Sequence, residues 1–222
     1  MKFRIYNCIS LFVSLFALCP SLLAQNVLSK SANMIKTDSL LFKNVCYFDP
    51  GLSGENVVWD FSDYLHSEGS YPVIFNLDSV DVYTSIEDQQ QVRYYLESDT
   101  LFNYEIESPL KHEVFPEPLF KMKYPCCYGD SITRPFMGYG FYSGDHPYVE
   151  KGISTVVADA YGSIILSNKD SLKNVLRVYS LKSSSICMDD PSNNPDPDKM
   201  RQIIEERYDW YARGCRYPVF TS

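Results

Sequence analysis

Aromatic, acidic and imidazole side chains that could contact a ligand gather between residues 136 and 148. The candidate ligand-binding residues there are Tyr139, Phe141, Tyr142, Asp145, His146 and Tyr148. Exposed aromatic rings can stack on sugar faces or contact a protein partner, and the glycines of this stretch permit sharp backbone paths. The commoner role of such rings is to fill the core of a curved sheet. The sequence leaves both interpretations open, with a glycan or an envelope protein as the possible partner.

No familiar catalytic pattern occurs in the chain. The nucleophile elbow, the zinc-protease helix, the phosphate-binding loop and the dinucleotide-binding glycines are all missing. Ser143, Asp145 and His146 stand within one loop, whereas a catalytic triad takes its members from several elements. A glycosidase needs two carboxylates across a cleft. Asp145, Glu150 and Asp159 lie near expected loops and could face one another, but among the 28 acidic residues the sequence singles out no pair. We therefore expect no catalytic residue and no cofactor.

Oxygen donors alternate along residues 189–198, a turn-rich acidic segment. They are Asp190, Ser192, Asn194, Asp196 and Asp198. An EF-hand calcium loop needs glycine at its sixth position and glutamate at its twelfth. Counting from Asp190 places Pro195 and Arg201 there instead, and cysteine pairs with zinc-site spacing are also absent. We expect a solvated hairpin tip and no metal site, with a looser calcium site as the alternative.

Period-two alternation of apolar and polar residues indicates β-strands through most of the chain. Expected strands cover residues 57–61, 72–77, 91–98, 100–105 and 174–179. Ser98 and Asp99 suit a hairpin turn, and residues 159–162 suggest a second turn between strands at 152–160 and 162–166. Residues 200–212 could open as a helix, but their apolar positions fall mainly on one side of a strand, so we favour a long strand.

These elements define an all-β fold class. We expect one antiparallel domain over residues 25–222, built as a large curved sheet, a β-sandwich or an open barrel with few short helices. Residues 29–42 are expected to form a short helix or a loop. Hydrophobic residues make up 45% and aromatic residues 15% of the chain, which is enough for a substantial core. That core is expected to include Tyr208, Trp210, Tyr211 and Tyr217, with Arg216 paired to a buried carboxylate.

The first 24 residues have the order of a secretory signal peptide. Lys2 and Arg4 form a basic start, an apolar run covers residues 8–19, and the segment ends on the small residue Ala24. The run is shorter than the ~20 apolar residues that span a bilayer, so a membrane anchor is the less favoured alternative. Lipid attachment at Cys19 is another alternative, although the residue before this cysteine is not small. We expect cleavage after Ala24 and export to the periplasm, the cell surface or the medium.

The charge balance limits the classes of partner. The chain carries 20 basic and 28 acidic residues, a formal net charge of −8. Without Lys2 and Arg4 the balance is 18 against 28, or −10. An acidic surface disfavours nucleic acid and anionic lipid but permits cations and neutral ligands such as sugars. We therefore expect no nucleic-acid partner. No later segment is long and apolar enough to cross a membrane, so we also expect no transmembrane segment.

The cysteines beyond the signal segment are Cys46, Cys126, Cys127, Cys187 and Cys215. Export permits disulfides, but an odd number leaves at least one thiol without an intramolecular partner. Cys126 and Cys127 are adjacent, and a bond between them would strain the intervening peptide. The other pairings stay open, and the alternative is that these cysteines serve as small buried hydrophobic residues.

Several stretches in order along the chain resemble exported Bacteroidota proteins of unknown function. The matching segments are Gly54–Ser62 ("WDFS"), Tyr124–Ser131 ("YGDS"), Ala158–Leu166 ("DGYGTLILP"), Lys173–Val178 ("NVLRV") and Tyr208–Phe220 ("YxWYxxGxRYPVF"). Ala160 stands where such proteins usually have the first glycine of "DGYG". These proteins often continue into a C-terminal sorting domain, whereas this sequence ends at Ser222. The resemblance implies an exported, β-rich protein and carries over no catalytic residue.

The sequence favours an exported, non-catalytic β-rich module that binds a ligand or contributes to the cell envelope. The alternative is a secreted hydrolase that acts on glycans or envelope components. The two differ in what a structure would show. An enzyme would bring two carboxylates or a histidine together in one deep pocket, whereas a binding module would present aromatic rings in a groove.

Overall fold

The computed structural model describes residues 27–63, 66–166, 171–188 and 197–222. Its elements are α1 (Lys30–Asn33), β1 (Asp38–Val45), β2 (Gly54–Asp60), β3 (His66–Ser79), β4 (Val82–Glu87), β5 (Gln90–Glu97), β6 (Thr100–Glu107), β7 (Lys111–Lys123), β8 (Ser131–Tyr142), β9 (His146–Ile165), β10 (Ser171–Cys187), a short 3-10 turn (Pro197–Lys199), β11 (Arg201–Ala212) and β12 (Phe220–Thr221). The predicted signal peptide and most of the acidic segment at 189–198 lie outside the described residues. Within the described ranges, no helix is long and apolar enough to cross a membrane.

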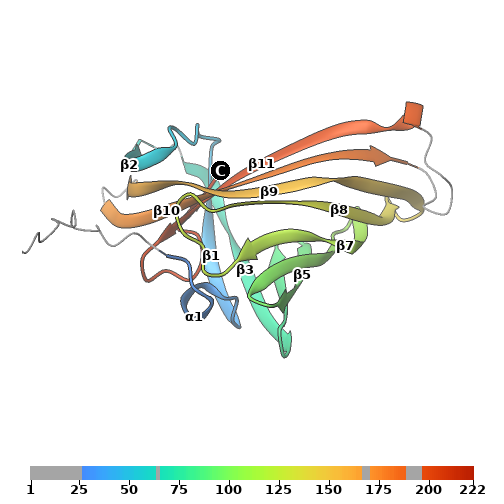
Figure 1. The fold of residues 1–222 in the computed structure, drawn as a ribbon, viewed down its shortest axis with the longest axis horizontal. Coiled ribbons are helices and arrows are strands. Elements are labelled where there is room, and N and C mark those ends of the chain that lie inside the picture. Colours follow the sequence, from blue (N-terminus) through green and yellow to red (C-terminus); the bar gives the residue numbers. More distant parts are fainter. Residues whose placement is uncertain (1–26, 64–65, 167–170, 189–196) are drawn as a thin grey trace, which may run out of the picture.

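All described strands belong to one open sheet of 12 strands, which confirms the all-β prediction. The order is β1-β3-β4-β5-β6-β7-β8-β9-β10-β11-β12, antiparallel throughout. β2 is the exception, because it runs parallel to the last part of β9, beyond Val157, where the pairing of β9 with β8 stops. In Figure 1 the long strands β8–β11 extend side by side, and β3–β7 curl beneath them. The curl gives the sheet an inner and an outer face.

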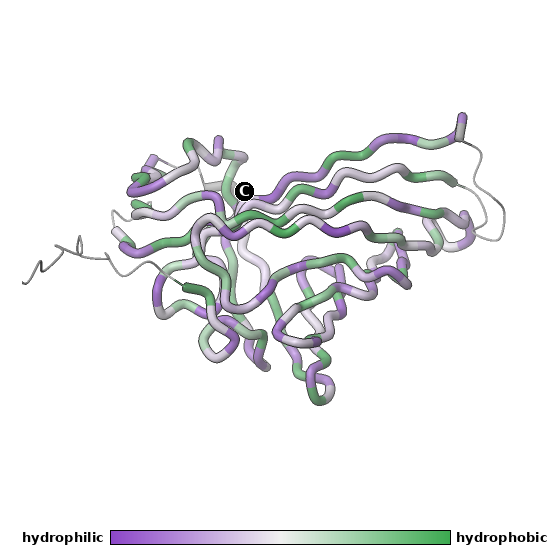
Figure 2. The backbone as a smooth tube through the Cα atoms, in the orientation of Figure 1, coloured by the Kyte–Doolittle hydropathy of each residue, from purple (hydrophilic) through white to green (hydrophobic). Residues whose placement is uncertain are grey.

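The inner face holds the larger core. Side chains from β4–β7 meet side chains from β9–β11 there, among them Tyr83, Phe102, Phe120, Val156, Leu176 and Tyr211. Figure 2 shows hydrophobic and hydrophilic residues following one another along the long strands, as the period of a pleated strand requires. The sequence periodicity therefore separates the two faces correctly along most of the sheet.

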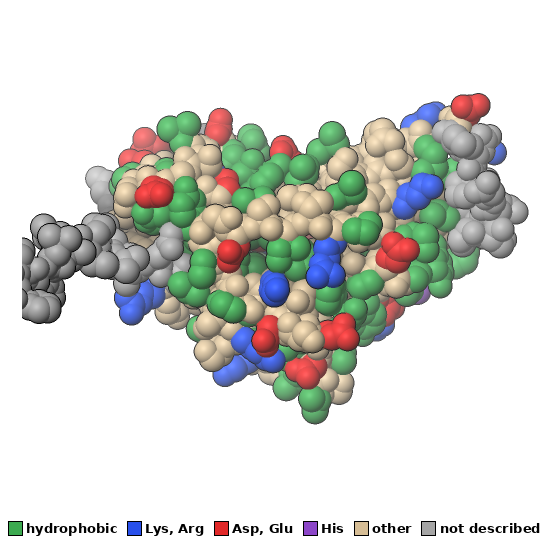
Figure 3. All heavy atoms as spheres, viewed as in Figure 1, with side chains coloured by type: hydrophobic (Ala, Val, Ile, Leu, Met, Phe, Trp, Pro, Cys, Tyr) green, Lys and Arg blue, Asp and Glu red, His purple; other side chains and the backbone are tan. Residues whose placement is uncertain are grey.

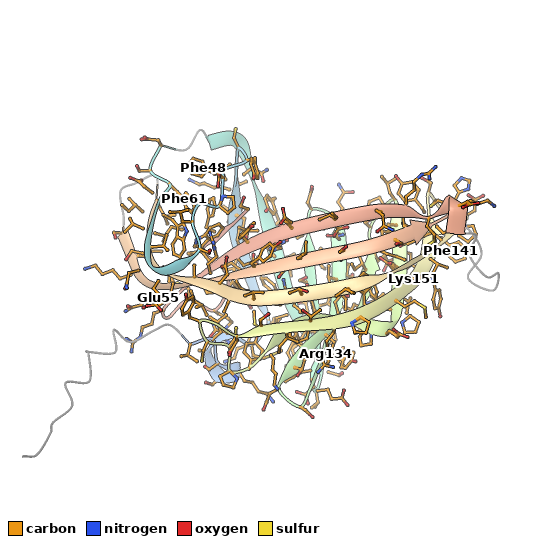
Figure 4. All side chains as sticks on the ribbon, turned by 45° about the horizontal axis from the view of Figure 1, so that its top comes forward. Phe48, Glu55, Phe61, Arg134, Phe141 and Lys151 are labelled. Carbon is orange, nitrogen blue, oxygen red and sulfur yellow. The ribbon has the colours of Figure 1, made fainter. Side chains whose placement is uncertain are left out.

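A second core lies on the outer face, where β2 covers the ends of β9, β10 and β11. Trp59 and Phe61 pack there against Ile164, Val175 and Trp210. The Trp59 and Trp210 rings meet edge to face with centroids 6.0 Å apart. Phe48 and Phe61, both labelled in Figure 4, make another edge contact at 5.2 Å. The expected burial of Trp210 is confirmed, since its side chain has 0% exposure.

Arg177 stands at the centre of this outer core, with a side chain only 2% exposed. Its Nε and Nη2 donate to Asp159 at 2.9 and 2.7 Å. Its Nη1 donates to the backbone carbonyls of Pro50 at 2.5 Å and Gly51 at 3.2 Å. The guanidinium also lies 5.5 Å from the centroid of the Trp59 ring. One side chain thus ties the loop before β2 to the sheet.

The hairpin predicted at residues 159–162 is wrong, because β9 passes through this region without turning. Its pairing with β10 shifts register there, and the resulting bulge puts Ala158 in the inner core but Ala160 in the outer core. The alternation therefore breaks as it would at a turn. Gly162 serves the close approach of β2, since a Cβ at this position would lie 1.8 Å from the Val57 carbonyl oxygen.

Other predicted elements are confirmed. Ser98 and Asp99 have φ values of 47° and 63°, as a tight turn between β5 and β6 requires. Residues 201–212 form the strand β11 rather than a helix. Residues 29–42 contain α1, where the Ser29 hydroxyl accepts from the Ala32 N–H at 3.3 Å, and then the start of β1.

All five cysteines of the described chain are free, so no disulfide joins any two of them in this structure. Cys126 and Cys187 are buried, Cys127 and Cys215 are half-buried, and Cys46 is exposed. Burial raises the pKa of Cys126 to about 12. The buried cysteines therefore act as small hydrophobic side chains.

Candidate ligand-binding site

A cavity of about 310 Å³ lies on the inner face of the sheet. It forms where β1, β3, β4 and β5 curl toward β7, β11 and the segment that follows β11. Aromatic side chains supply much of its wall: Tyr71, Phe75, Tyr94, Tyr124, Tyr211 and Tyr217. Exposed Lys43, Asn44 and Gln90 also line it, so the cavity reaches solvent. Its size suits a small organic ligand.

Basic side chains outnumber acidic ones in the cavity wall, whereas acidic residues outnumber basic ones in the whole chain. Lys43, Lys121, Arg207 and Arg216 line the cavity, against the two acidic residues Glu87 and Asp209. Glu87 accepts a hydrogen bond from the Tyr71 hydroxyl at 2.8 Å. Burial and this carboxylate together raise the pKa of Tyr71 to about 12, so its hydroxyl keeps its proton. The cavity is a cationic region within an acidic protein.

Asp209 holds two of these cations in place. Its carboxylate is 3% exposed and lies 3.0 Å from Arg207 Nε and 3.7 Å from Lys121 Nζ. Thr221 Oγ1 also donates to it at 2.8 Å. Burial would raise the pKa of Asp209, but the two cations and these hydrogen bonds outweigh burial and lower it. A single negative charge therefore stands between two positive ones.

The two cations respond differently to this shared carboxylate. Burial, with a contribution from the nearby Arg207 charge, lowers the pKa of Lys121 even though Asp209 opposes the shift. Arg207 keeps 48% of its side chain exposed. Only its Nε contacts Asp209, and among the described residues no hydrogen bond or ion pair engages its two Nη atoms. Arg207 therefore offers a positioned guanidinium to the cavity.

The local sequence explains this arrangement once residues 201–212 are known to be a strand. Arg207, Asp209 and Tyr211 are two residues apart, so their side chains share the inner face. Tyr208 and Trp210 alternate with them and face the outer core. Sequence reasoning missed Arg207 and Asp209 as a site. The available signal was the alternation of charged and aromatic residues along one predicted strand.

Arg216 differs from its predicted role. It was expected to pair with a buried carboxylate, but its Nη1 donates to the Met34 carbonyl oxygen at 2.7 Å. The buried arginine that does meet a carboxylate is Arg177. Tyr211 and Tyr217 are buried as expected, and both also form part of the cavity wall.

The structure distributes the sequence-predicted candidate residues over the β8–β9 hairpin, where Tyr142 lies opposite His146 near the turn and Tyr148 is buried. Tyr139 and Phe141 lie on the outer face of β8 with 41% and 50% exposure, and Phe141 is near the far end of the long strands in Figure 4. Tyr142 ends β8 and is 44% exposed. Gly138 and Gly140 lie within β8 and leave room for β7, since a Cβ at Gly140 would lie 1.8 Å from the His112 carbonyl oxygen. The third glycine of this stretch, Gly144, has a φ of 93° in the β8–β9 turn.

The remaining candidates lie at the start of β9. Asp145 and His146 are exposed in and beside the β8–β9 turn, with Oδ1 and Nε2 3.7 Å apart. Tyr148 is buried on the inner face, with its ring centroid 5.5 Å from Lys111 Nζ. All six predicted residues lie outside the cavity wall. Their predicted role in ligand binding stays a prediction.

A pair of buried carboxylates, Glu113 and Glu150, shares the ammonium group of Lys111. Its Nζ lies 2.7 Å from Glu113 Oε2, off the direction of a hydrogen bond, and 3.7 Å from Glu150 Oε2. Glu150 also pairs with Lys182 at 2.9 Å and accepts from the Ser184 hydroxyl at 2.6 Å. Both carboxylates are at most 2% exposed, and neither lines the cavity. The protein encloses both carboxylates in this structure.

The pKa values of these two carboxyl groups move in opposite directions. Burial raises the pKa of Glu113, and the Glu150 carboxylate adds to this rise while Lys111 opposes it. Burial acts on Glu150 in the same sense, but Lys182, Ser184 and Lys111 together lower its pKa. Opposite shifts are typical of an acid and base pair in an enzyme. Here both carboxylates are enclosed, so we assign the pair a structural role.

The other carboxylates considered for catalysis are separated. Asp145 is exposed at a turn, and Asp159 is bound to Arg177 in the outer core. The described residues contain no group of three or more histidine, cysteine or acidic side chains placed to hold a metal ion. A smaller cavity of about 210 Å³ lies beside β7–β9 and is lined mainly by apolar residues such as Phe120, Ile132 and Val156.

Comparisons of the chain with protein-family models, with curated proteins and with solved structures give no match.

Proposed function

We propose that this protein is an exported, non-catalytic binding module that takes a small anionic molecule with an apolar body into the inner cavity. The observation that carries the proposal is Arg207. Asp209 fixes its Nε, its two Nη atoms have no partner among the described residues, and aromatic walls surround it. A guanidinium presented in this way suits a carboxylate, sulfate or phosphate group.

The contrast between the cavity and the rest of the molecule supports an anionic ligand. The chain carries a net charge of −8. On the face in Figure 3, acidic and basic side chains are interspersed and form no continuous basic area. A cationic cavity in such a protein selects anions locally, although the overall charge disfavours large anionic surfaces. An acidic sugar or another anionic envelope component has the required chemistry.

The carboxylates in the cavity favour binding over hydrolysis. Asp209 is 3% exposed and is occupied by Arg207, Lys121 and Thr221. Glu87 is occupied by the Tyr71 hydroxyl. A glycosidase needs two carboxylates that face the scissile bond, whereas these two position cationic and phenolic groups.

A pair of fluorescent probes tests the proposal. Anilinonaphthalene sulfonate and phenylnaphthylamine share their rings, but only the first carries an anionic group. We expect the sulfonate to bind the folded protein more tightly. Replacing Arg207 by methionine should weaken sulfonate binding by about ten- to a hundredfold, because charge-assisted hydrogen bonds are lost. Phenylnaphthylamine binding should stay unchanged, as measured by fluorescence titration.

Arg213→Met is the matched control, because Arg213 is exposed in the turn after β11 and does not line the cavity. It should leave the affinity for both probes unchanged. Equal sulfonate affinity in the wild type and the Arg207→Met variant would show that Arg207 does not bind the anion.

The export part of the proposal predicts the mature N-terminus. The basic start, the apolar run and Ala24 support removal of the first 24 residues, and the resemblance to exported Bacteroidota proteins supports the same compartment. Intact-mass spectrometry of protein recovered from its native host should give a chain that begins at Gln25. A chain that retains Lys2 and Arg4 would contradict this prediction, and a lipid-modified Cys19 would favour the alternative anchor.

A further inference from the structure

The first half of β11 presents an unpaired strand edge. Residues 201–207 pair with β10 on one side. On the other side β12 reaches only Asp209 and Trp210, and within the described chain no strand continues beyond them. Figure 1 shows β11 along the margin of the long strands. We call residues 201–207 the free edge.

Alternate backbone N–H and C=O groups of the free edge point away from β10, where another strand could pair with them. Tyr208 and Ser222 exchange N–H···O bonds of 2.8 and 3.0 Å, and the Trp210 carbonyl accepts from Val219 N–H at 2.8 Å. Even-numbered residues of β11 therefore direct their N–H and C=O groups away from β10. By alternation, Gln202, Ile204 and Glu206 direct theirs to the open side. The register with β10 is continuous along this part.

We propose that the free edge pairs with the free edge of a second copy of this chain. The two strands run antiparallel about a two-fold axis that passes between the two Ile203 residues. In this register Gln202 lies opposite Ile204 of the second copy, and both residues direct their backbone groups across the interface. Arg201 lies opposite Glu205 of the second copy, twice by symmetry. Within residues 201–205 the strand edge is thus complementary to itself in both hydrogen bonds and charge, whereas Arg207 lies opposite Lys199, which precedes the strand in the second copy.

Charge disfavours the two neighbouring registers closer to the end of β11. Only shifts that place even-numbered residues opposite even-numbered residues keep the hydrogen-bond pattern. An axis through Ile204 would place Arg201 opposite Arg207, and an axis through Glu205 would place two glutamates opposite each other. Like charges directly opposite each other destabilise a strand pair. Further shifts toward the end of β11 meet Tyr208, whose outward groups are already bonded to Ser222.

The positions of the charged side chains strengthen the selected register. Arg201 and Glu205 are odd-numbered, so they meet in pairs without hydrogen bonds between their backbones, where opposing side chains are closer. Arg201 is exposed, and Glu205 keeps 59% of its side chain exposed while it contacts Lys182 at 3.0 Å. An edge that carries charges of both signs repels an unmatched strand. Its own copy is the strand that these charges fit.

The symmetry also fixes how the two copies face. A two-fold axis between antiparallel strands is perpendicular to the sheet, so the two sheets join with both inner faces on the same side. The two ligand cavities then face in the same direction. This inference does not depend on the identity of the ligand, and the dimer is expected with an empty cavity.

Sedimentation of the purified protein over a concentration series tests the pairing. We expect a reversible monomer–dimer equilibrium in the wild type. Ile204→Pro should leave only monomer, because it removes an outward N–H that the β10 ladder does not use. Ile204→Thr keeps that N–H and should still dimerise. A wild type that stays monomeric at all concentrations, or an Ile204→Pro variant that still dimerises, overturns the proposal.

Charge reversal tests the register. Arg201→Glu and Glu205→Arg alone each create two like-charge pairs and should raise the dimer dissociation constant by about tenfold or more. The double variant restores both pairs with reversed sign, so its dissociation constant should return to within about threefold of the wild type. Failure of the double variant to recover overturns the Ile203-centred register. Far-UV circular dichroism confirms that each variant is folded.

Discussion

Replacing Arg177 by methionine is expected to lower the free energy of unfolding by about 3–5 kcal/mol. Methionine keeps an unbranched stem of similar shape but removes the guanidinium. Asp159 then loses the partner that contacts both of its oxygens, and the carbonyls of Pro50 and Gly51 lose their donor. A partner removed from a buried ion pair leaves an uncompensated charge, which costs more than the pair contributes. Urea denaturation measures the change.

The control for this variant is Arg213→Met, an exposed arginine that should change stability by less than about 0.5 kcal/mol. The double variant Arg177→Met/Asp159→Leu removes both charges together. It should be more stable than Arg177→Met alone, because no carboxylate remains without a partner. Equal stability of the single and double variants would show that the Asp159 charge is not the source of the loss.

Glu150→Gln is expected to lower the free energy of unfolding at neutral pH by about 3 kcal/mol. Glu113→Gln, on β7 and separated from β9 by β8, should change it by less than about 1 kcal/mol. The reason is the different state of the two carboxyl groups. Lys182 and Ser184 stabilise the charged form of Glu150. Burial disfavours the charged form of Glu113, so its pKa is raised and loss of its charge costs little.

The pH dependence of the two variants should differ in sign. The ordinary pKa of both groups is 4.5. Glu113 has a raised pKa, so its contribution to stability is full below 4.5 and is lost as pH rises through its folded pKa. Glu150 has a lowered pKa, so its contribution is present above 4.5 and is lost as pH falls through its folded pKa.

Relative to the wild type, Glu113→Gln should therefore gain stability as pH rises above 4.5, whereas the stability deficit of Glu150→Gln should shrink as pH falls below 4.5. Urea titrations at several pH values on both sides of 4.5 measure both differences. Parallel curves for the two variants would contradict the assignment of opposite pKa shifts.

The sequence predicts the strands well but fails where the alternation changes face. The β5–β6 hairpin and β11 follow from period-two patterns. The break near residues 158–160 has the same pattern at a turn and at a bulge, and only the pairing partner distinguishes them. β10 on one side and β2 on the other hold β9 straight there. Neither contact is local in sequence, so periodicity cannot supply it.

The candidate site was hidden for a related reason. Arg207 and Asp209 share a face once β11 is a strand, but their role depends on Lys121 from β7 and on the aromatic wall from β3–β5. Four of the motif segments meet at the outer core through Trp59, Asp159, Arg177 and Trp210. Those motif residues therefore have a structural explanation in this chain. The aromatic residues at 136–148 were candidates for ligand binding because the sequence does not show which of them are buried and which are exposed.

The route of the chain through β2 implies an order of folding. From β3 to β11, each strand pairs with the next one along the chain, so every step closes a short loop. β2 instead pairs Gly54 with Ala160. This contact closes a much longer loop, so it costs more chain entropy than each hairpin does. We expect the meander to form first and β2 to dock last, so that the outer core is completed at the end of folding.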